Sequence, residues 1–461
     1  MPDKFQFDEQ TGTWVGIYQA PSTPPDQSQR FMRNLHNQVI RQGMPHTRPG
    51  KQKLNGKQCG SSGNSTVYGM GIYRGSPDEL IIACGKQIQK ILISGTGGNS
   101  TISGGDPTNL TENYPTGWTA HVGARTIFAQ LKGSMYIVNG SDDNKKYNGT
   151  NLTRMGLVAP STLGAPTKAS GALNGSYSYK ATLVSGTTYG SNESEPTAGL
   201  TVTYSSQTGT FTIPTIPSAD PQIDRWNLYR APQGDTTTYY RINTSAISSG
   251  TTIADNINDD VLIAGTKIDT SGKNAIPPTS FTTLITHQGR LVGVSNADKN
   301  ALVWSDQGLD TSGIFFKPES WPAVNHLPFG EQGGTKITAL ASFFEWLVVF
   351  QDFGVWSVKG TLSDSSDRII SPILVAPDTH GIGVSDQGNV AVGENKILFA
   401  SKTGLYHLVR DLGSLRVELA VKDLSTNVRP LFQQTNFSGG GVAIYDRDQS
   451  RWIFWGKGAK K

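Results

Sequence analysis

Cysteine is nearly absent from this chain. Its 461 residues include only Cys59 and Cys84. Two cysteines cannot build the disulfide framework of a cysteine-rich secreted domain, and neither lies in a C-x-x-C pair of the kind that holds structural zinc. We therefore expect Cys84, in the run Leu80-Ile-Ile-Ala-Cys, to behave as a small buried hydrophobic residue.

Charged residues and long apolar runs are also scarce. Charged side chains make up 16% of the chain, whereas 53 glycines and 24 prolines supply many turns. The most apolar run, Leu340 to Phe350, is interrupted by Glu345 and is too short to cross a bilayer. The first residues, Met1 to Glu9, are acidic where a signal peptide would be basic and then apolar. The sequence thus predicts a folded, turn-rich protein with neither a signal peptide nor a membrane-spanning segment.

Acidic residues are missing from one long stretch. Between Gln27 and Pro77 there is no Asp or Glu, but there are eight Lys or Arg residues. The stretch carries +8 and the whole chain +4, so the remainder sums to +4 − 8 = −4. This asymmetry predicts an anionic partner, either a phosphate backbone or an acidic protein surface, and a solvated basic surface is the alternative. The candidate contact residues are Arg30, Arg33, Arg41, Arg48, Lys51, Lys53 and Lys57.

The sequence motifs of common enzymes are not present. No G-x-x-x-x-G-K-[ST], H-E-x-x-H or G-x-S-x-G occurs. Ser305-Asp-Gln-Gly and Ser385-Asp-Gln-Gly are similar to the Asp-box turn of sialidases, but their spacing is one residue short. We interpret both as turns in which Ser and Asp bond their own backbone and Gly supplies a positive φ. The sequence therefore predicts no enzyme, with no catalytic, metal-binding or cofactor-binding residues.

Three further groups of residues have alternative interpretations. His287 and His407 lie beside apolar runs, which favours hydrogen-bonded core or turn histidines over metal ligands. The clusters at 142–144 and 255–260 could bind calcium weakly, but hairpin turns explain them as well. Six tryptophans could line a sugar groove, although packing between sheets is more common for such positions. These are Trp304, Trp321, Trp346, Trp356, Trp452 and Trp455.

Short strands dominate the sequence pattern. Runs such as Met135 to Val138, Leu347 to Phe350 and Lys396 to Ala400 are rich in branched or aromatic residues and are bounded by turn formers. Pairs of such runs joined by a tight turn recur at a period of roughly 50 residues, which is typical of β-propeller blades. The units begin near Phe128, Leu284, Leu340 and Val390, with weaker ones at 79–94 and 442–455. A pair of β-sandwiches is the alternative.

The repeat is interrupted by a stretch rich in Thr, Ser and Gly. Tyr177-Ser-Tyr-Lys and Trp226-Asn-Leu-Tyr alternate as strands of a sandwich do, and Ile276-Pro-Pro closes the stretch. We therefore predict an all-β fold in which propeller-like blades are interrupted by an immunoglobulin- or fibronectin-III-like β-sandwich. The predicted units are an N-terminal arm with the first blades at 1–163, the inserted sandwich at 164–277 and the remaining blades at 278–461.

Helical patterns are few. Residues 26–43 place Phe31, Leu35 and Val39 four apart, which fits either a short amphipathic helix ending at Gly43 or an extended arm. A second short helix could start at Ser425.

Taken in order, these motifs resemble those of a protein family. The chain is similar to the tail nozzle, or tubular, β-propeller proteins of short-tailed bacteriophages and to the related hub proteins beneath the portal. The insertion resembles the fibronectin-III-like modules of phage structural proteins. The segments that carry the resemblance are Arg30-Phe-Met-Arg-Asn-Leu, Thr47-Arg-Pro-Gly-Lys, Tyr136-Ile-Val-Asn-Gly, His287-Gln-Gly-Arg, Val303-Trp-Ser-Asp, Val355-Trp-Ser-Val, His380-Gly-Ile-Gly-Val and Ile444-Tyr-Asp-Arg.

The resemblance implies a structural protein of the virion tail, assembled in the host cytoplasm. It implies a homohexameric ring around the DNA ejection channel, below the portal and adaptor, with no catalytic residues. The basic block would then dock on an acidic adaptor ring, with transient, non-specific contact to genomic DNA. A carbohydrate-binding or glycan-cleaving propeller at the tail tip is the alternative function.

Overall fold

The computed structural model describes most of the chain between residues 66 and 455. The described ranges are 4–8, 13–15, 38–41, 44–47, 66–94, 101–102, 108–110, 125–185, 192–215, 220–268, 274–306, 319–329, 336–358, 360, 362, 372–374, 381–393, 395–411, 418–424, 441–447 and 451–455. For the strands before residue 48 only the backbone is described.

Six antiparallel sheets of four or five strands are found in this described part of the chain. The first three blades are β5 (Val67–Tyr73), β6 (Glu79–Cys84), β7 (Gln87–Ser94), β8 (Thr101–Ile102) and β9 (Thr108–Asn109); β10 (Ile127–Leu131), β11 (Ser134–Val138), β12 (Lys145–Tyr147) and β13 (Leu152–Arg154); and β21 (Phe281–His287), β22 (Arg290–Ser295), β23 (Ala301–Trp304) and β24 (His326–Pro328). The last three are β25 (Ile337–Phe343), β26 (Trp346–Gln351), β27 (Val355–Val358) and β28 (Pro372–Leu374); β29 (Val390–Val392), β30 (Lys396–Ala400), β31 (Leu405–Asp411) and β32 (Glu418–Asp423); and β33 (Val442–Asp446), β34 (Arg451–Trp455), β1 (Lys4–Asp8) and β2 (Thr13–Val15).

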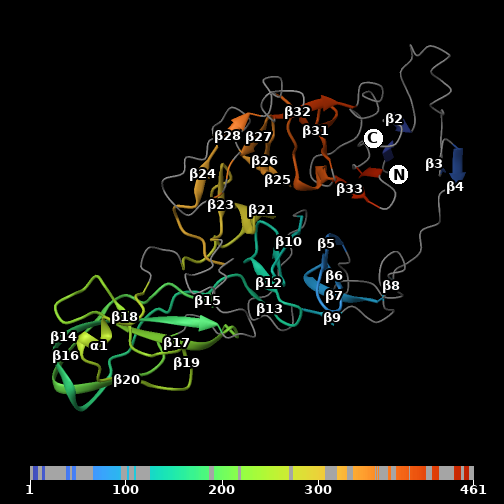
Figure 1. Cartoon of the computed structure of the whole chain (residues 1–461). Helices are drawn as coiled ribbons and strands as arrows, with labels where there is room; N and C mark the ends of the chain where they lie inside the picture. Colours follow the sequence, from blue (N-terminus) through green and yellow to red (C-terminus); the bar gives the residue numbers. More distant parts are fainter. Residues whose placement is uncertain are drawn as a thin grey trace.

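The blades are arranged around a common centre, so the predicted all-β, propeller-like fold is confirmed (Figure 1). The first strand of each blade lies innermost, and β5, β10, β21, β25, β29 and β33 follow one another around the ring. Tight turns join the first two strands of several blades. Lys132 and Gln288 adopt positive φ angles in two of these turns, each followed by a glycine that does the same.

The sixth blade is built from both ends of the chain. β1 pairs with β34 from Lys4 opposite Trp455 to Asp8 opposite Arg451, and β2 pairs with β1 on the outside. This pairing joins the two ends of the chain within one blade, because residues more than 440 positions apart share one sheet. The C-terminal blade unit was expected from sequence, but the contribution of the N-terminal strands was not.

Apolar side chains from neighbouring blades form shared cores. Tyr73 of the first blade meets Tyr147 of the second edge-on at a centroid distance of 5.2 Å, and both are buried. Phe350 of the fourth blade and Phe399 of the fifth are 5.1 Å apart and fully buried. Each such side chain contributes roughly 1.5–3 kcal/mol when fully buried. The blades are therefore held together by their flat faces.

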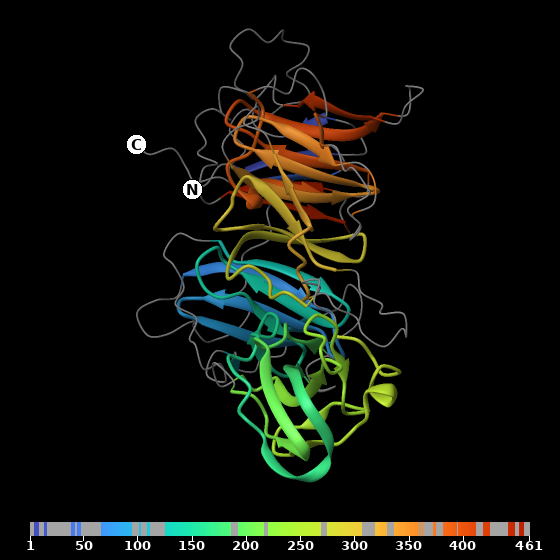
Figure 2. The same cartoon turned by 90° about the vertical axis from the view of Figure 1, so that its left-hand side faces the viewer.

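The insertion between the second and third blades forms an all-β module of its own. It comprises β14 (Thr167–Ser185), β15 (Asn192–Glu193), β16 (Leu200–Phe211), β17 (Ile223–Arg230), β18 (Tyr240–Arg241), β19 (Ile247–Ser248), β20 (Ile253–Asp255) and the short helix α1 (Asp259–Leu262). The module projects from one side of the ring (Figures 1 and 2). Its strands join in one curled sheet, because β14 pairs first with β16 and then, beyond its bulges, with β17.

A buried ionic network lies in the core of this module. Arg230 and Asp255 are both fully buried, with Nη1 of Arg230 2.8 Å from Oδ2 of Asp255. Tyr179 donates a hydrogen bond to the same carboxylate at 2.7 Å, and Nη2 of Arg230 reaches the carbonyl of Ile257. The charges are thus paired and hydrogen-bonded, as buried charges must be.

Two expectations about local structure need correction. Residues 38–41 form strand β3 (Gln38–Arg41), which pairs with β4 (Met44–Thr47), so the amphipathic helix does not extend to Gly43. Residues 26–37 and the helix expected from Ser425 lie outside the described residues. Cys84 is fully buried as predicted, but its sulfur forms a disulfide bond instead of remaining a reduced thiol.

Candidate functional site

The predicted basic contact residues lie, in the sequence, on either side of a small hairpin or within it. Arg41 ends strand β3, and Arg30, Arg33, Arg48, Lys51, Lys53 and Lys57 lie outside the described residues. Strands β3 and β4 pair with each other and with no other strand in the described part of the chain. Figure 1 shows this hairpin well separated from the blades. An isolated two-stranded hairpin is only marginally stable in water.

A second candidate site lies on the axis of the propeller. An open cavity of about 340 Å³ is lined mainly by the innermost strands of five blades and the residues that precede them. Its lining includes Met70, Arg125, Phe128, Leu284, Gln387 and Val442. The cavity is the size of a small-molecule pocket, because such pockets measure about 300–1,000 Å³.

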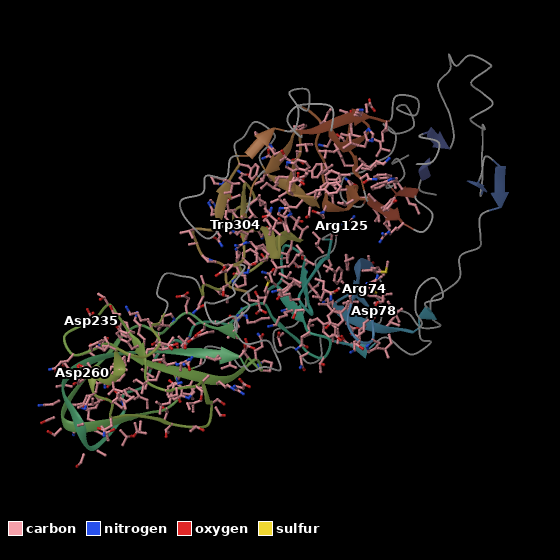
Figure 3. All side chains as sticks on the ribbon, in the orientation of Figure 1. Arg74, Asp78, Arg125, Asp235, Asp260 and Trp304 are labelled. Atoms are coloured by element: carbon pink, nitrogen blue, oxygen red, sulfur yellow. The ribbon has the colours of Figure 1, made fainter. Side chains whose placement is uncertain are left out.

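Arg125 spans this axial cavity. It precedes β10, and its Nε lies 2.7 Å from Oδ1 of Asp386, which precedes β29. Its Nη2 donates a hydrogen bond to the carbonyl of Gly441, just before β33. Figure 3 places Arg125 near the centre of the ring. One guanidinium therefore ties the second blade to the fifth and the sixth.

The turn around Asp386 is shaped to receive this guanidinium. Asp386 accepts a hydrogen bond of 2.8 Å from the amide of Gly388 and so caps the 3-10 helix η7 (Gln387–Asn389). We expected Gly388 to supply a positive φ, but Gly388 is not among the residues with a positive φ. Glycine is needed at position 388 for a steric reason, because a Cβ there would collide with the Arg125 guanidinium.

Gln387 links two further innermost strands. Its Oε1 accepts hydrogen bonds from Thr283 Oγ1 and the Leu340 amide, both at 2.8 Å, and its Nε2 donates to the Leu340 carbonyl. The Ser385-Asp-Gln-Gly motif thus fastens blades together. No part of it resembles a pair of catalytic carboxylates flanking a sugar bond.

The other Asp motif is also structural in its described residues. Ser305 Oγ accepts a hydrogen bond of 3.0 Å from the Leu291 amide, and Asp306 lies 3.9 Å from Nη1 of Arg290. Residues 307 and 308 lie outside the described part.

The two histidines behave differently from each other. Nδ1 of His287 lies 2.8 Å from Ser342 Oγ, and burial lowers the pKa of His287 to about 4. The ring nitrogens of His407 are buried without a hydrogen-bond partner, so the expectation of a hydrogen-bonded histidine is wrong there. Burial, with help from Lys396 and Lys422, lowers the pKa of His407 to about 4.

The possible calcium clusters are used for turns and ion pairs. Asn139 Oδ1 accepts hydrogen bonds from the amides of Ser141 and Asp142. Asp255 accepts a hydrogen bond from the Arg230 guanidinium. Within the described ranges no group of three or more His, Cys, Asp or Glu side chains could hold a metal ion.

Tryptophans form packing contacts. Five of the six are buried, namely Trp304, Trp321, Trp346, Trp356 and Trp452. The ring centroids of Trp321 and Phe281 are 4.8 Å apart. This confirms packing between sheets for these five, and the side chain of Trp455 lies outside the described part. None of the five offers the exposed aromatic face that a sugar groove needs.

A buried ion pair near the insertion was missed by the sequence reasoning. Lys146 Nζ lies 2.7 Å from Oε1 of Glu319, and both side chains are almost fully buried. Glu319 Oε2 also accepts a hydrogen bond of 2.8 Å from the Gly156 amide. Nothing in the local sequence pairs residues so far apart.

No protein-family model and no curated protein matches the chain. Solved structures that are similar include YCF48 from Cyanidioschyzon merolae (13% identity, TM-score 0.31, 85% of this chain and 93% of that one). Others are AztD from Citrobacter koseri (14%, 0.22, 76% and 84%) and the Pan2 WD40 domain from Neurospora crassa (10%, 0.24, 86% and 90%). Because these TM-scores are below 0.5, the propeller assignment rests on the strand order described above. No helix in the described ranges is long and apolar enough to cross a bilayer.

Proposed function

We propose that the chain is a structural protein of a bacteriophage tail, one subunit of a hexameric ring that forms part of the DNA ejection channel below the portal and adaptor. The single observation that carries the proposal is the lone β3–β4 hairpin inside the acid-free basic stretch. A hairpin that is unstable alone and surrounded by cations fits an arm that docks on an acidic partner. The order of the sequence motifs supports the same family.

The size of the axial cavity limits where DNA can pass. About 340 Å³, crossed by Arg125, is far too small for a duplex whose major groove alone is about 12 Å wide. The channel of the proposed ring is therefore formed between subunits, with the propellers as its wall.

In this proposal the basic stretch binds mainly the protein partner and contacts DNA only weakly. Cations that neutralise phosphates bind DNA in a salt-dependent way, and strong binding would slow the passage of the genome. Contact with DNA is then transient and non-specific, and the adaptor ring is the lasting partner.

Reversing charge in the arm tests the proposal. In a phage that encodes the chain, Lys51→Glu, Lys53→Glu and Lys57→Glu together are expected to leave the chain out of purified virions, as measured by quantitative mass spectrometry. The same charge change at exposed lysines on the blades and insertion, Lys267→Glu, Lys299→Glu and Lys336→Glu, is the matched control and is expected to assemble. A wild-type chain that stays monomeric and is absent from virions would overturn the proposal.

A further inference from the structure

The axial cavity has mainly apolar walls. Met70 and Ile72 of β5 line it together with Phe128 of β10, Leu284 of β21 and Val442 of β33. Met70 and Ile72 are 59% and 44% exposed, which is high for large apolar side chains on an innermost strand. Exposed apolar side chains that lie together often mark a binding surface. The cavity therefore offers apolar surface that a ligand can cover.

Arg125 is the one charged side chain among the described residues that line the cavity. Its Nε donates a hydrogen bond to Asp386, which does not line the cavity, and its Nη2 donates to the Gly441 carbonyl. Within the described ranges Nη1 of Arg125 makes no hydrogen bond and is open to solvent. Asp386 and Gly441 thus hold the guanidinium in place and leave Nη1 for a ligand.

The two glutamines in the cavity wall already have protein partners. Gln130 accepts a hydrogen bond from the Arg74 amide and donates one to the Arg74 carbonyl. The side-chain amide of Gln387 exchanges the same pair of bonds with the backbone of Leu340. The hydrogen bonds that remain for a ligand are therefore those of Arg125, a donor without acceptor capacity.

A carboxylate is the acceptor that suits this site. A guanidinium is planar, stays charged and binds carboxylates through charge-assisted hydrogen bonds. Asp386 offsets part of the charge of Arg125, so an apolar body that covers Met70 and Ile72 must add to the affinity. The volume of about 340 Å³ corresponds to roughly eleven water molecules, which is room for a small organic molecule.

We propose that the axial cavity binds a small carboxylate with an apolar body, held by Nη1 of Arg125 at one end and by Met70 and Ile72 along its body. The lining residues come from five blades, so the ligand contacts strands that are far apart in the sequence. A ligand that binds only the folded chain stabilises it by mass action. This site is independent of any role in a tail ring.

Methyl NMR of the full chain, labelled on its methionines, tests the proposal with hydrocinnamate as the probe. The Met70 methyl lines the cavity and is expected to shift in a saturable way as hydrocinnamate is added. Met155 is buried away from the cavity lining and is the internal control, so its methyl is expected to stay in place. The neutral amide of the same acid is expected to bind about tenfold more weakly, because it loses the charge-assisted hydrogen bonds.

Calorimetry on variants separates the two ends of the site. Arg125→Lys keeps the charge but loses the planar fork, and it is expected to weaken hydrocinnamate binding about tenfold. Met70→Ser with Ile72→Ser removes the apolar wall at exposed positions and is expected to weaken binding by a similar factor. Val324→Ser, at a residue 64% exposed on the third blade and outside the cavity lining, is the control and is expected to bind as the wild type does.

Three results would overturn the proposal. The absence of saturable binding at millimolar hydrocinnamate excludes the site. Equal affinity for the acid and its amide excludes recognition of the carboxylate by Arg125, and this comparison uses the wild-type chain, so it holds even if Arg125→Lys does not fold. Unchanged affinity in the variant of Met70 and Ile72 places the ligand outside the axial cavity.

Discussion

Arg125 and Asp386 form an ion pair of 2.7 Å across the axis of the propeller, although 261 positions separate them in the sequence. Each side chain is 23% exposed, so the pair is partly shielded from water. Together with the bond from Arg125 to the Gly441 carbonyl, this pair connects three innermost strands that share no continuous sheet.

A double-mutant cycle measures what this pair contributes. Arg125→Ala and Asp386→Asn are each expected to lower the urea midpoint, with a coupling energy of about 1 kcal/mol because the hydrogen bonds are charge-assisted and half-buried. Arg74 and Asp78 form an exposed pair at the edge of the first blade and serve as the control (Figure 3). Their coupling is expected to lie near the low end of 0–1 kcal/mol. Equal coupling in both cycles would contradict a special role for Arg125.

The loss of stability caused by replacing Gly388 is expected to depend on Arg125. Gly388→Ala places a Cβ against the guanidinium, so the ion pair must shift, and the cost is expected to match that of Arg125→Ala. In an Arg125→Ala background the same substitution is expected to be nearly neutral, because the colliding group is gone and Gly388 has no positive φ. Urea unfolding of the two single variants and the double variant provides the comparison. Strictly additive losses would show that the glycine has another purpose.

Acidification is expected to destabilise the propeller through two histidines. The pKa values of His287 and His407 fall to about 4 in the folded protein, below the unfolded value of about 6.5. Between these values the unfolded state binds more protons, so stability is lost as the pH falls from about 6.5 to 4. The loss is on the order of 3 kcal/mol for each histidine.

Melting temperatures at pH 7 and pH 5 check this expectation. His287→Gln with His407→Leu should reduce the difference between the two temperatures, and His407→Leu alone should raise the melting temperature at pH 7 by removing unpartnered buried nitrogens. His326→Gln, at an exposed site beside Asp298, is the control. An unchanged pH response in the double variant would rule out these two residues as its source.

Removing one partner of the buried ion pair between Lys146 and Glu319 is expected to destabilise the fold strongly. Replacing both partners with apolar residues is expected to destabilise it much less. Glu319→Gln or Lys146→Met alone leaves an uncompensated buried charge, at a cost of about 3–5 kcal/mol. Lys146→Met with Glu319→Leu is expected to cost much less than the sum, apart from the lost bond to the Gly156 amide. Thermal unfolding of the three variants tests this. Additive losses would mean that the two charges do not interact.

Local patterns were enough to predict the blade strands and the interruption. The runs at 135–138, 347–350 and 396–400 all fall inside observed strands, because branched and aromatic residues between turn formers specify a strand locally. The expectation of packing between sheets is confirmed for the five described tryptophans, Trp304, Trp321, Trp346, Trp356 and Trp452.

Contacts between distant residues could not be predicted in this way. The pairing of β1 with β34, the Arg125 to Asp386 tie and the disulfide of Cys84 join parts of the chain whose separation leaves no local pattern. The alternation in Phe5-Gln-Phe and Thr13-Trp-Val was the only available sign of the N-terminal strands. The steric requirement for glycine at position 388 also comes from the Arg125 guanidinium, which lies next to Gly388 only in the folded chain.

Cryo-electron microscopy of the assembled particle would show whether the chain forms a hexameric ring around the DNA channel. We expect six copies in a ring, with propellers as the wall, a channel wide enough for duplex DNA between subunits, and the β3–β4 hairpin covered by an acidic neighbour. A particle that lacks the chain, or one that holds it as single, separate subunits, would contradict the proposal.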